Sequence, residues 1–297
     1  MVGDRNCIVA VCSSLVYSSG KKYQNKQHYV KGFGGKTMKQ ASSSAVLTGD
    51  KLNHESTFSY LKKLLTKGAM DWNISINVLV IILVIPFAIA LAGAASALLG
   101  KEAYKWFTQE DGFAEIMQVL FYSLALIISI VITRREWREK NKIVAILYTG
   151  LCFGLFFLIG EELNWGQRIF GWQTAESFAA INKQDETNLH NIYGVGAAFK
   201  WVQLLVGAYG TLFPLALLKW KPAVRVQSYA EKLIPNYTLI PYFFMLFVWR
   251  IFRNLFEVPD RFYFVVAEYN EVMEMILAIG FFLFVVYQWR KLRSQEV

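Results

Sequence analysis

Histidine is scarce in this chain. Its 297 residues include three histidines, His28, His54 and His190, and only His190 falls in the apolar part of the sequence. Bis-histidine haem binding, histidine-box hydroxylases and histidine-rich zinc sites all need more than one histidine in one place, so they are excluded. The sequence also lacks HExxH and GxSxG, so it carries no local signature of a zinc protease or a serine hydrolase.

Cysteine is equally scarce, and no phosphate-binding loop is present. Cys7, Cys12 and Cys152 fit no metal-binding spacing and imply no disulfide framework. The stretch KGFGGKT, residues 31–37, resembles a P-loop, but the first glycine of GxxxxGK[ST] would have to be residue 30, which is Val30. The chain is therefore neither a disulfide scaffold nor a recognisable P-loop protein.

Apolar residues, by contrast, are abundant, at 55% of the chain with 16% aromatic. A bilayer-spanning helix needs about 20 mostly apolar residues. Six runs are candidates, at residues 74–100, 113–133, 143–160, 198–218, 238–256 and 271–289. The sequence thus predicts an all-α polytopic membrane protein with about six transmembrane helices. In such a protein the net charge of +9 reflects its loops, and we expect no nucleic-acid partner.

The first 70 residues differ from the rest in being rich in Ser, Gly, Lys, Asn and Gln. We expect residues 1–70 to be a disordered, basic N-terminal extension or a mis-annotated start, with Met38 and Met70 as other starts. Residues 61–70 read as a short basic amphipathic lead-in to a transmembrane domain at residues 71–297.

The charges of the connections alternate along the chain. Basic residues gather before the first apolar run, in RREWREKNK, between the fourth and fifth runs and in the C-terminal tail. The other three connections are acidic, with three acids against two bases in 101–112, five against two in 161–197 and five against one in 257–274. Because cytoplasmic loops are the basic ones, we expect both termini in the cytoplasm.

This topology gathers a group of acidic residues on the extracytoplasmic face. They are Glu110, Asp111, Glu115, Glu161, Glu162, Asp185, Glu186, Glu257, Glu268, Glu271 and Glu274. The helix dipole favours acids at a helix start, which explains Glu110, Asp111 and Glu268 without a function. The same dipole disfavours negative charge at the C-terminal end of a helix, where Glu161 and Glu162 lie. Glu274 lies about one turn inside an apolar run, where an ionisable group is a functional candidate.

Helical spacing suggests how these groups pair. If the third helix continues past residue 160, Glu161, Asn164, Trp165 and Arg168 share one face and Glu162 points into the bundle. Asp185 can cap a short helix in which Glu186 and His190 are i, i+4 neighbours. Arg250 and Arg253 either pair with Glu257 and other acids or hold an anionic head group.

These residues form the candidate site. The acid/base or catalytic candidates are Glu161, Glu162, Glu186 and His190. The candidates for substrate binding are Trp165, Arg168, Asn188, Asn191, Arg250 and Arg253. A divalent cation such as Mg²⁺, Mn²⁺ or Ca²⁺ would draw its ligands from Glu162, Glu186, His190, Glu271 and Glu274.

At EELNWGQR, ETNLHN and EDG the chain resembles a family of uncharacterised bacterial multi-pass membrane proteins. Here these stretches are residues 161–168, 186–191 and 110–112, and the resemblance covers about residues 70–290. It implies a bacterial inner membrane location and brings no activity.

EELNWGQR also looks like the Glu-Glu and Arg motif of intramembrane prenyl-protein proteases. There the arginine follows four residues after the second glutamate, whereas Arg168 follows Glu162 by six, and the two later histidines of that family have no counterpart. The comparison therefore argues against intramembrane protease activity.

Three functions stay open at this point. The first is a metal-assisted hydrolase or transferase acting on a lipid or lipid-linked substrate at the outer leaflet. The second is a cation-coupled transport or binding protein with Glu274 as its inner group. The third is an accessory subunit of a membrane complex. The sequence does not indicate the substrate, the oligomeric state or the protein partners.

Overall fold

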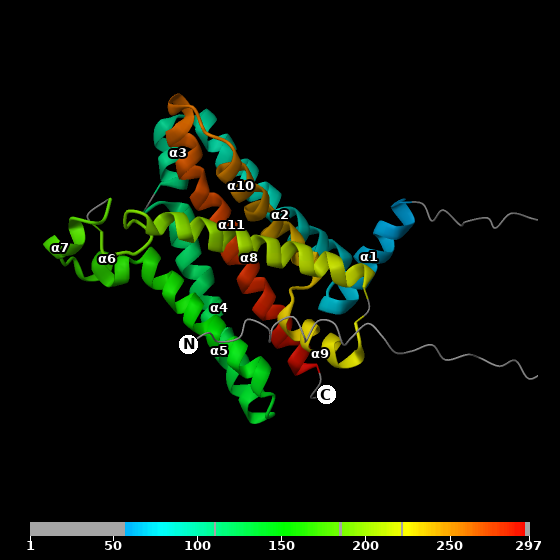
Figure 1. The fold of residues 1–297 in the computed structure, drawn as a ribbon. Helices are drawn as coiled ribbons and strands as arrows, with labels where there is room; N and C mark the ends of the chain where they lie inside the picture. Colours follow the sequence, from blue (N-terminus) through cyan, green and yellow to red (C-terminus); the bar gives the residue numbers. More distant parts are fainter. Residues whose placement is uncertain (1–56, 110, 184–185, 221, 295–297) are drawn as a thin grey trace, which may run out of the picture. The chain divides into compact units, whose positions relative to one another are not determined.

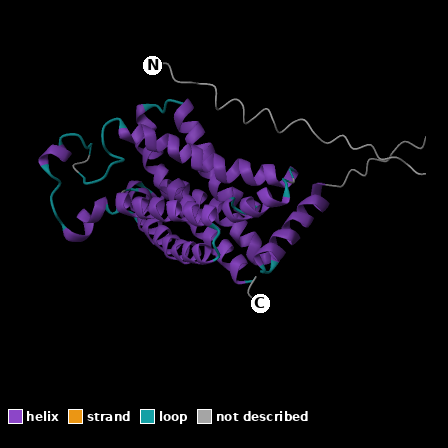
Figure 2. Cartoon of the chain, turned by 60° about the horizontal axis from the view of Figure 1, so that its bottom comes forward, coloured by secondary structure: helices purple, strands orange, loops and turns teal. Residues whose placement is uncertain are grey.

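The computed structural model describes residues 57–109, 111–183, 186–220 and 222–294, and within them the chain forms helices and loops without a β-strand (Figure 2). Cys7, Cys12, Met38 and the P-loop-like stretch lie outside the described residues, as do Glu110 and Asp185. The all-α prediction is confirmed for the described part of the chain.

The helices follow one another with short connections, apart from a longer loop between α5 and α8. Their bounds are α1 (Thr57–Trp72), α2 (Ile76–Ser96), α3 (Lys101–Thr108), α4 (Phe113–Arg138), α5 (Lys142–Glu162), α6 (Gln167–Phe170), α7 (Glu176–Ala179), α8 (Val195–Lys219), α9 (Val224–Leu233), α10 (Ile240–Leu255) and α11 (Asp260–Arg293).

Within the described residues, five helical segments are long and apolar enough to cross a membrane: Ile76–Leu99, Lys101–Arg138, Lys142–Glu162, Val195–Lys219 and Asp260–Arg293. They contain five of the six runs expected from the sequence. The remaining run corresponds to α10, which has 16 residues and is shorter than the roughly 20 that span a bilayer.

Helix α11 is the central helix of the bundle. It packs against α4, α10 and α2, and it lies between the α2–α10 side and the α4–α5 side in Figure 1. In its most apolar 18-residue window 67% of the residues are buried, against 22–28% in the other four candidate spans. The outer helices therefore leave broad apolar faces uncovered, as expected of surfaces that contact lipid.

Small residues allow the helices to approach closely. A Cβ atom added at Gly207 of α8 would lie 2.9 Å from the backbone of Phe247 in α10, and one at Gly93 of α2 would lie 2.9 Å from Val272 in α11. Helix association in membranes depends on such packing because lipid supplies no hydrophobic drive between helices.

The ends of the helices opposite the acidic residues are fixed by a buried ion pair. Lys232 of α9 lies 2.7 and 2.9 Å from the two carboxylate oxygens of Glu136 in α4. The Asn141 side chain donates a hydrogen bond to Glu136 Oε2 at 2.8 Å. Residues 57–70, assigned to the N-terminal extension from composition, belong to α1, where the Leu64 carbonyl accepts a hydrogen bond from Tyr237.

Candidate functional site

Four carboxylates from three helices form one group, the acidic cluster: Glu115, Glu162, Glu271 and Glu274. Glu115 lies in the first turn of α4, and Glu162 is the last residue of α5. Glu271 and Glu274 lie about three to four turns into α11, which begins at Asp260. The helix dipole, which acts within the first turn, therefore does not explain these two acids.

The acidic cluster lies inside the end of the bundle at which α2 finishes. Val272, beside Glu271, packs on Gly93 of α2, and the α2 span continues to Leu99. Six residues of helix correspond to about 9 Å. If α2 spans the bilayer, the cluster sits at the level of the hydrocarbon rather than at the membrane surface.

Polar side chains on neighbouring helices contact the acids of α11. Gln118 of α4 donates to Glu271 Oε2 at 2.9 Å, and Arg250 of α10 lies 3.3 Å from Glu274 Oε1. Asn270 donates to the same oxygen of Glu274. Tyr122, one turn after Gln118, is fully buried within electrostatic range of the acidic cluster.

Glu162 is the least compensated member of the cluster. It is buried and lies within electrostatic range of Glu115, Glu271 and Glu274. No hydrogen bond from the described part of the chain reaches its carboxylate, and Arg168 donates to its backbone carbonyl at 3.0 Å. The expectation that Glu162 points into the bundle is confirmed.

Arg168 connects the acidic cluster to the outer loop. Its guanidinium pairs with Glu115, lies 3.1 Å from Asp111 and lies 3.6 Å from Glu186. Burial by itself disfavours its charge, but Glu115 and Asp111 together outweigh that effect and hold the pKa of Arg168 above its ordinary value. Arg168 is thus a permanent cation at the entrance of the cluster.

The helix that carries Glu161 and Glu162 does not continue to Arg168. Helix α5 stops at Glu162, and Asn164 and Trp165 adopt positive φ angles of 48° and 52°. The expectation of one continuous face from Glu161 to Arg168 is therefore wrong. Trp165 nevertheless folds back and donates to Glu161 Oε1 at 2.7 Å.

Glu161 anchors the loop between α5 and α8. Its Oε2 accepts the backbone N–H groups of Leu189 and His190 at 2.8 and 2.9 Å, and His190 Nδ1 lies 3.2 Å away. Glu161 is only 2% exposed, whereas the His190 side chain is 34% exposed. Glu161 thus fixes the orientation of a histidine that reaches the surface.

Further contacts join the same two stretches, and together with those of Glu161 we call them the loop network. Asn188 donates to Asn164 at 2.8 Å, and the Thr187 N–H donates to Gln167 at 2.7 Å. The pairing runs antiparallel, so residues 161–168 are bound side by side to residues 186–190. The two most distinctive stretches of the sequence are therefore structural partners.

Glu186 and His190 do not pair, which corrects the expected i, i+4 contact. Residues 186–190 form turns rather than a helix. Glu186 accepts from Asn188 at 2.7 Å and from Asn191 at 3.2 Å. Asn188 is buried within the loop network, which assigns it a structural contact in place of the expected substrate contact.

The proposed metal ligands are not gathered around one point. Among the described residues, no three His, Cys, Asp or Glu side chains are placed to hold a metal ion together. Glu186 and His190 belong to the loop network, whereas Glu162, Glu271 and Glu274 belong to the acidic cluster. The five residues that the sequence grouped as metal ligands therefore fall into two separate groups in the structure.

The two arginines of α10 have different partners. Arg250 is buried and pairs with Glu274 instead of Glu257. The guanidinium of Arg253 lies over the ring of Tyr263, 5.8 Å from its centroid. Only Arg250 therefore belongs to the acidic cluster's surroundings.

Sequence reasoning missed Gln118, Tyr122 and Asn270. A signal was present, because Glu115, Gln118 and Tyr122 follow one another at i, i+3 and i+7 within an apolar run, which puts three polar side chains on one helix face.

In comparisons with known proteins, no family model, curated protein or solved structure matches this chain. The resemblance to a bacterial membrane protein family therefore stays an expectation.

Proposed function

We propose that the protein is a bacterial plasma-membrane protein that binds protons in the acidic cluster and exchanges them during transport. One observation carries this proposal: four carboxylates share the interior of a helix bundle with two guanidinium groups, Arg168 and Arg250. The charges do not balance, and an uncompensated buried charge is costly.

Protons neutralise this excess more simply than a metal ion does. Carboxylates that share a site cannot all ionise at low cost, so a shared proton is the expected solution. A divalent cation would need several ligands around one point, and the geometry of the described residues does not favour that arrangement. Ionisable residues inside membrane proteins commonly serve as proton relays.

Infrared spectroscopy of the purified full chain tests proton binding directly. At neutral pH the wild type should show the carbonyl stretch of a protonated, buried carboxyl group, and the Glu162→Gln variant should lose part of that band. Glu231→Gln is the control, because Glu231 is exposed and paired with Lys291. The hydrogen bond from Lys291 holds the pKa of Glu231 below its ordinary value. Glu231 is therefore ionised at neutral pH in the wild type, and its replacement by Gln should leave the protonated carboxyl band unchanged.

The result would contradict the proposal if the wild type showed no protonated carboxyl band at neutral pH. Reconstitution into liposomes containing a pH-sensitive dye then tests movement. We expect proton flux with the wild type and with Glu231→Gln, and flux at least tenfold lower with Glu162→Gln.

A second candidate is an acid/base enzyme acting on a lipid or lipid-linked substrate at the outer leaflet. The contact between Glu161 and the partly exposed His190 favours it, because a carboxylate that orients an imidazole is a common arrangement for proton transfer. Turnover of a lipid extract by the wild type and its loss in His190→Gln would support this function over transport.

A further inference from the structure

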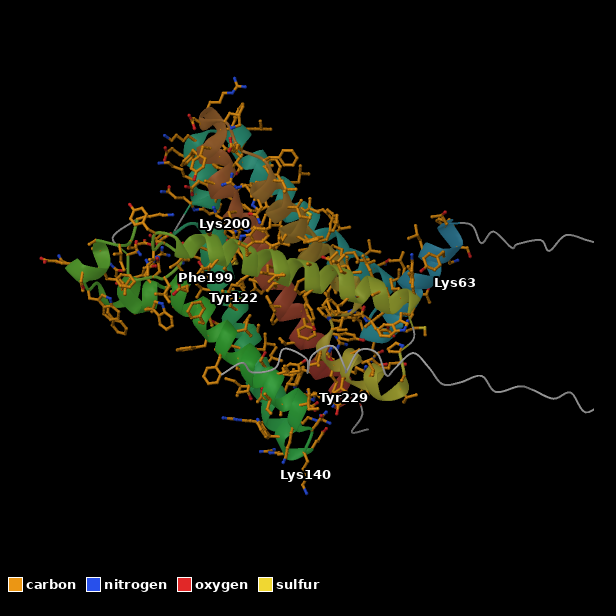
Figure 3. The ribbon with its side chains drawn as sticks, in the orientation of Figure 1. Lys63, Tyr122, Lys140, Phe199, Lys200 and Tyr229 are labelled. Carbon is orange, nitrogen blue, oxygen red and sulfur yellow. The ribbon has the colours of Figure 1, made fainter. Side chains whose placement is uncertain are left out.

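A second polar site lies where the first turns of α8 meet the last turns of α10. The two helices run antiparallel, since Gly210 packs on Phe243 and Gly207 packs on Phe247. Two turns further along, Lys200 and Gln203 of α8 reach the level of Arg250 and Arg253. Figure 3 shows Lys200 beside Phe199 at the start of α8.

Buried hydrogen-bonding atoms of α8, α10 and α11 have no partner among the described residues. The donors are Arg250 Nε and Asn254 Nδ2, about one turn apart on α10. The acceptors are Gln203 Oε1 on α8 and Asn270 Oδ1 on α11. Arg250 is only 4% exposed, so solvent does not satisfy its Nε–H group. Buried polar atoms normally have partners, and a group of unpartnered ones calls for a ligand.

The same site has an excess of positive charge. Lys200 lies within electrostatic range of Arg250 and Arg253. The structure gives an ion pair to Arg250, with Glu274, and shows none for Lys200 or Arg253 among the described residues. Glu271 also lies within electrostatic range of Arg250, so three cations share two carboxylates, which indicates an anionic ligand.

We infer that this site, made of Lys200, Gln203, Arg250, Arg253, Asn254 and Asn270, binds a phosphate ester that carries hydroxyl groups. Phosphate oxygens accept hydrogen bonds from Arg250 and Asn254 and neutralise the cations. Hydroxyl groups donate to Gln203 and Asn270, which an anion without hydroxyls would leave unpartnered. The inference does not rest on proton binding, although the site and the acidic cluster share Arg250 and Glu274.

The surroundings favour a lipid as the carrier of this phosphate. Val202 and Val206 flank Gln203 on α8 and line an apolar groove of about 550 Å³. The groove extends along α8 to Phe213 and is closed by aromatic residues of α10 and α11, among them Phe243 and Phe281. An acyl chain fits this lining, and the head group then lies at the donor-rich end.

Native mass spectrometry of the detergent-solubilised full chain tests the site with three probes. Phosphatidylglycerol has both the phosphate and the hydroxyls, phosphatidylcholine has the phosphate without hydroxyls, and glycerol 3-phosphate is the soluble counterpart. We expect one phosphatidylglycerol to bind at least tenfold more tightly than phosphatidylcholine. Lys200→Ala and Arg253→Met should each weaken that binding at least fivefold.

Arg261→Met is the matched control. Arg261 lies over the ring of Phe262 much as Arg253 lies over Tyr263, but it is outside the site and should leave binding unchanged. Lys200 and Arg253 are preferred to the buried Arg250, whose removal would leave Glu274 without its ion-pair partner. Equal binding of the two lipids, or unchanged binding in both site variants, would overturn the inference. Tight binding of glycerol 3-phosphate with the same losses would support the site with a soluble ligand.

Discussion

The carboxylate of Glu161, near the end of α5, makes four contacts with the loop that follows. It accepts two backbone N–H groups and the indole of Trp165, and it contacts His190. Hydrogen bonds to a charged group contribute about 1.5–3 kcal/mol each, and a buried donor left without its acceptor costs a similar amount.

We expect Glu161→Gln to lower the free energy of unfolding by about 2–3 kcal/mol, because the new amide group would face backbone donors that need an acceptor. Trypsin should then cleave after Lys183, inside the loop, faster than in the wild type. Glu176→Gln is the control, since Glu176 is exposed in the same loop. Equal cleavage rates in all three proteins would show that Glu161 does not hold the loop.

At this scale the sequence predicted which residues matter but not which residues pair. Glu161, Glu162, Glu186 and His190 were singled out, and each has a distinct place in the structure. The predicted pairings failed because they assumed helical geometry, whereas Asn164, Trp165 and Gly166 adopt positive φ and reverse the chain. Asn and Gly favour that conformation, but the presence of a tryptophan there depends on its contact with Glu161.

The contact between α8 and α10 depends on glycines at the points of closest approach. Gly207 faces the backbone of Phe247, which cannot move aside as a flexible side chain can. Gly154 of α5, in contrast, has open space where a Cβ would lie. The two glycines therefore form a matched pair within transmembrane helices.

Gly207→Ala should destabilise the protein by about 1–3 kcal/mol through overpacking. Gly154→Ala should be neutral or stabilise it by up to about 1 kcal/mol, because alanine favours a helix more than glycine does. Thermal unfolding in detergent measures both effects. If Gly154→Ala were the more damaging change, the packing of α8 on α10 described here would be wrong.

Element positions were largely predictable because bilayer thickness sets the length of apolar runs. The α10 helix marks the limit of that reasoning. Its run from 238 to 256 looked long enough, but Tyr237–Leu239 form a separate 3-10 turn and the helix ends at Leu255. Helix α11 was expected at 271–289 and extends to Asp260 because its first turns pack against α3, where the ring of Tyr104 contacts that of Phe264.

For the whole molecule, the orientation in the membrane is the most accessible prediction. Gln173 lies in the loop between α6 and α7, and Lys140 lies in the turn between α4 and α5, at the far end of α4 and α5 (Figure 3). We replace each by cysteine after changing Cys7, Cys12 and Cys152 to serine. A membrane-impermeant reagent should label Gln173→Cys in intact cells and Lys140→Cys only after permeabilisation.

The reverse labelling pattern would place the loop between α5 and α8, and with it the acidic cluster, on the cytoplasmic side. Labelling of both positions in intact cells would instead indicate that α5 does not cross the membrane.

The central position of α11 has a consequence for how the protein is made. Of the described helices it is the last to leave the ribosome, yet it supplies Glu271 and Glu274 and packs against α4, α10 and α2. Until it inserts, Glu115 and Glu162 lack their neighbours from α11. Completion of the bundle therefore waits until α11 has been synthesised, and we expect a nascent chain that stops before residue 260 to be a substrate for membrane quality control rather than a partly active protein.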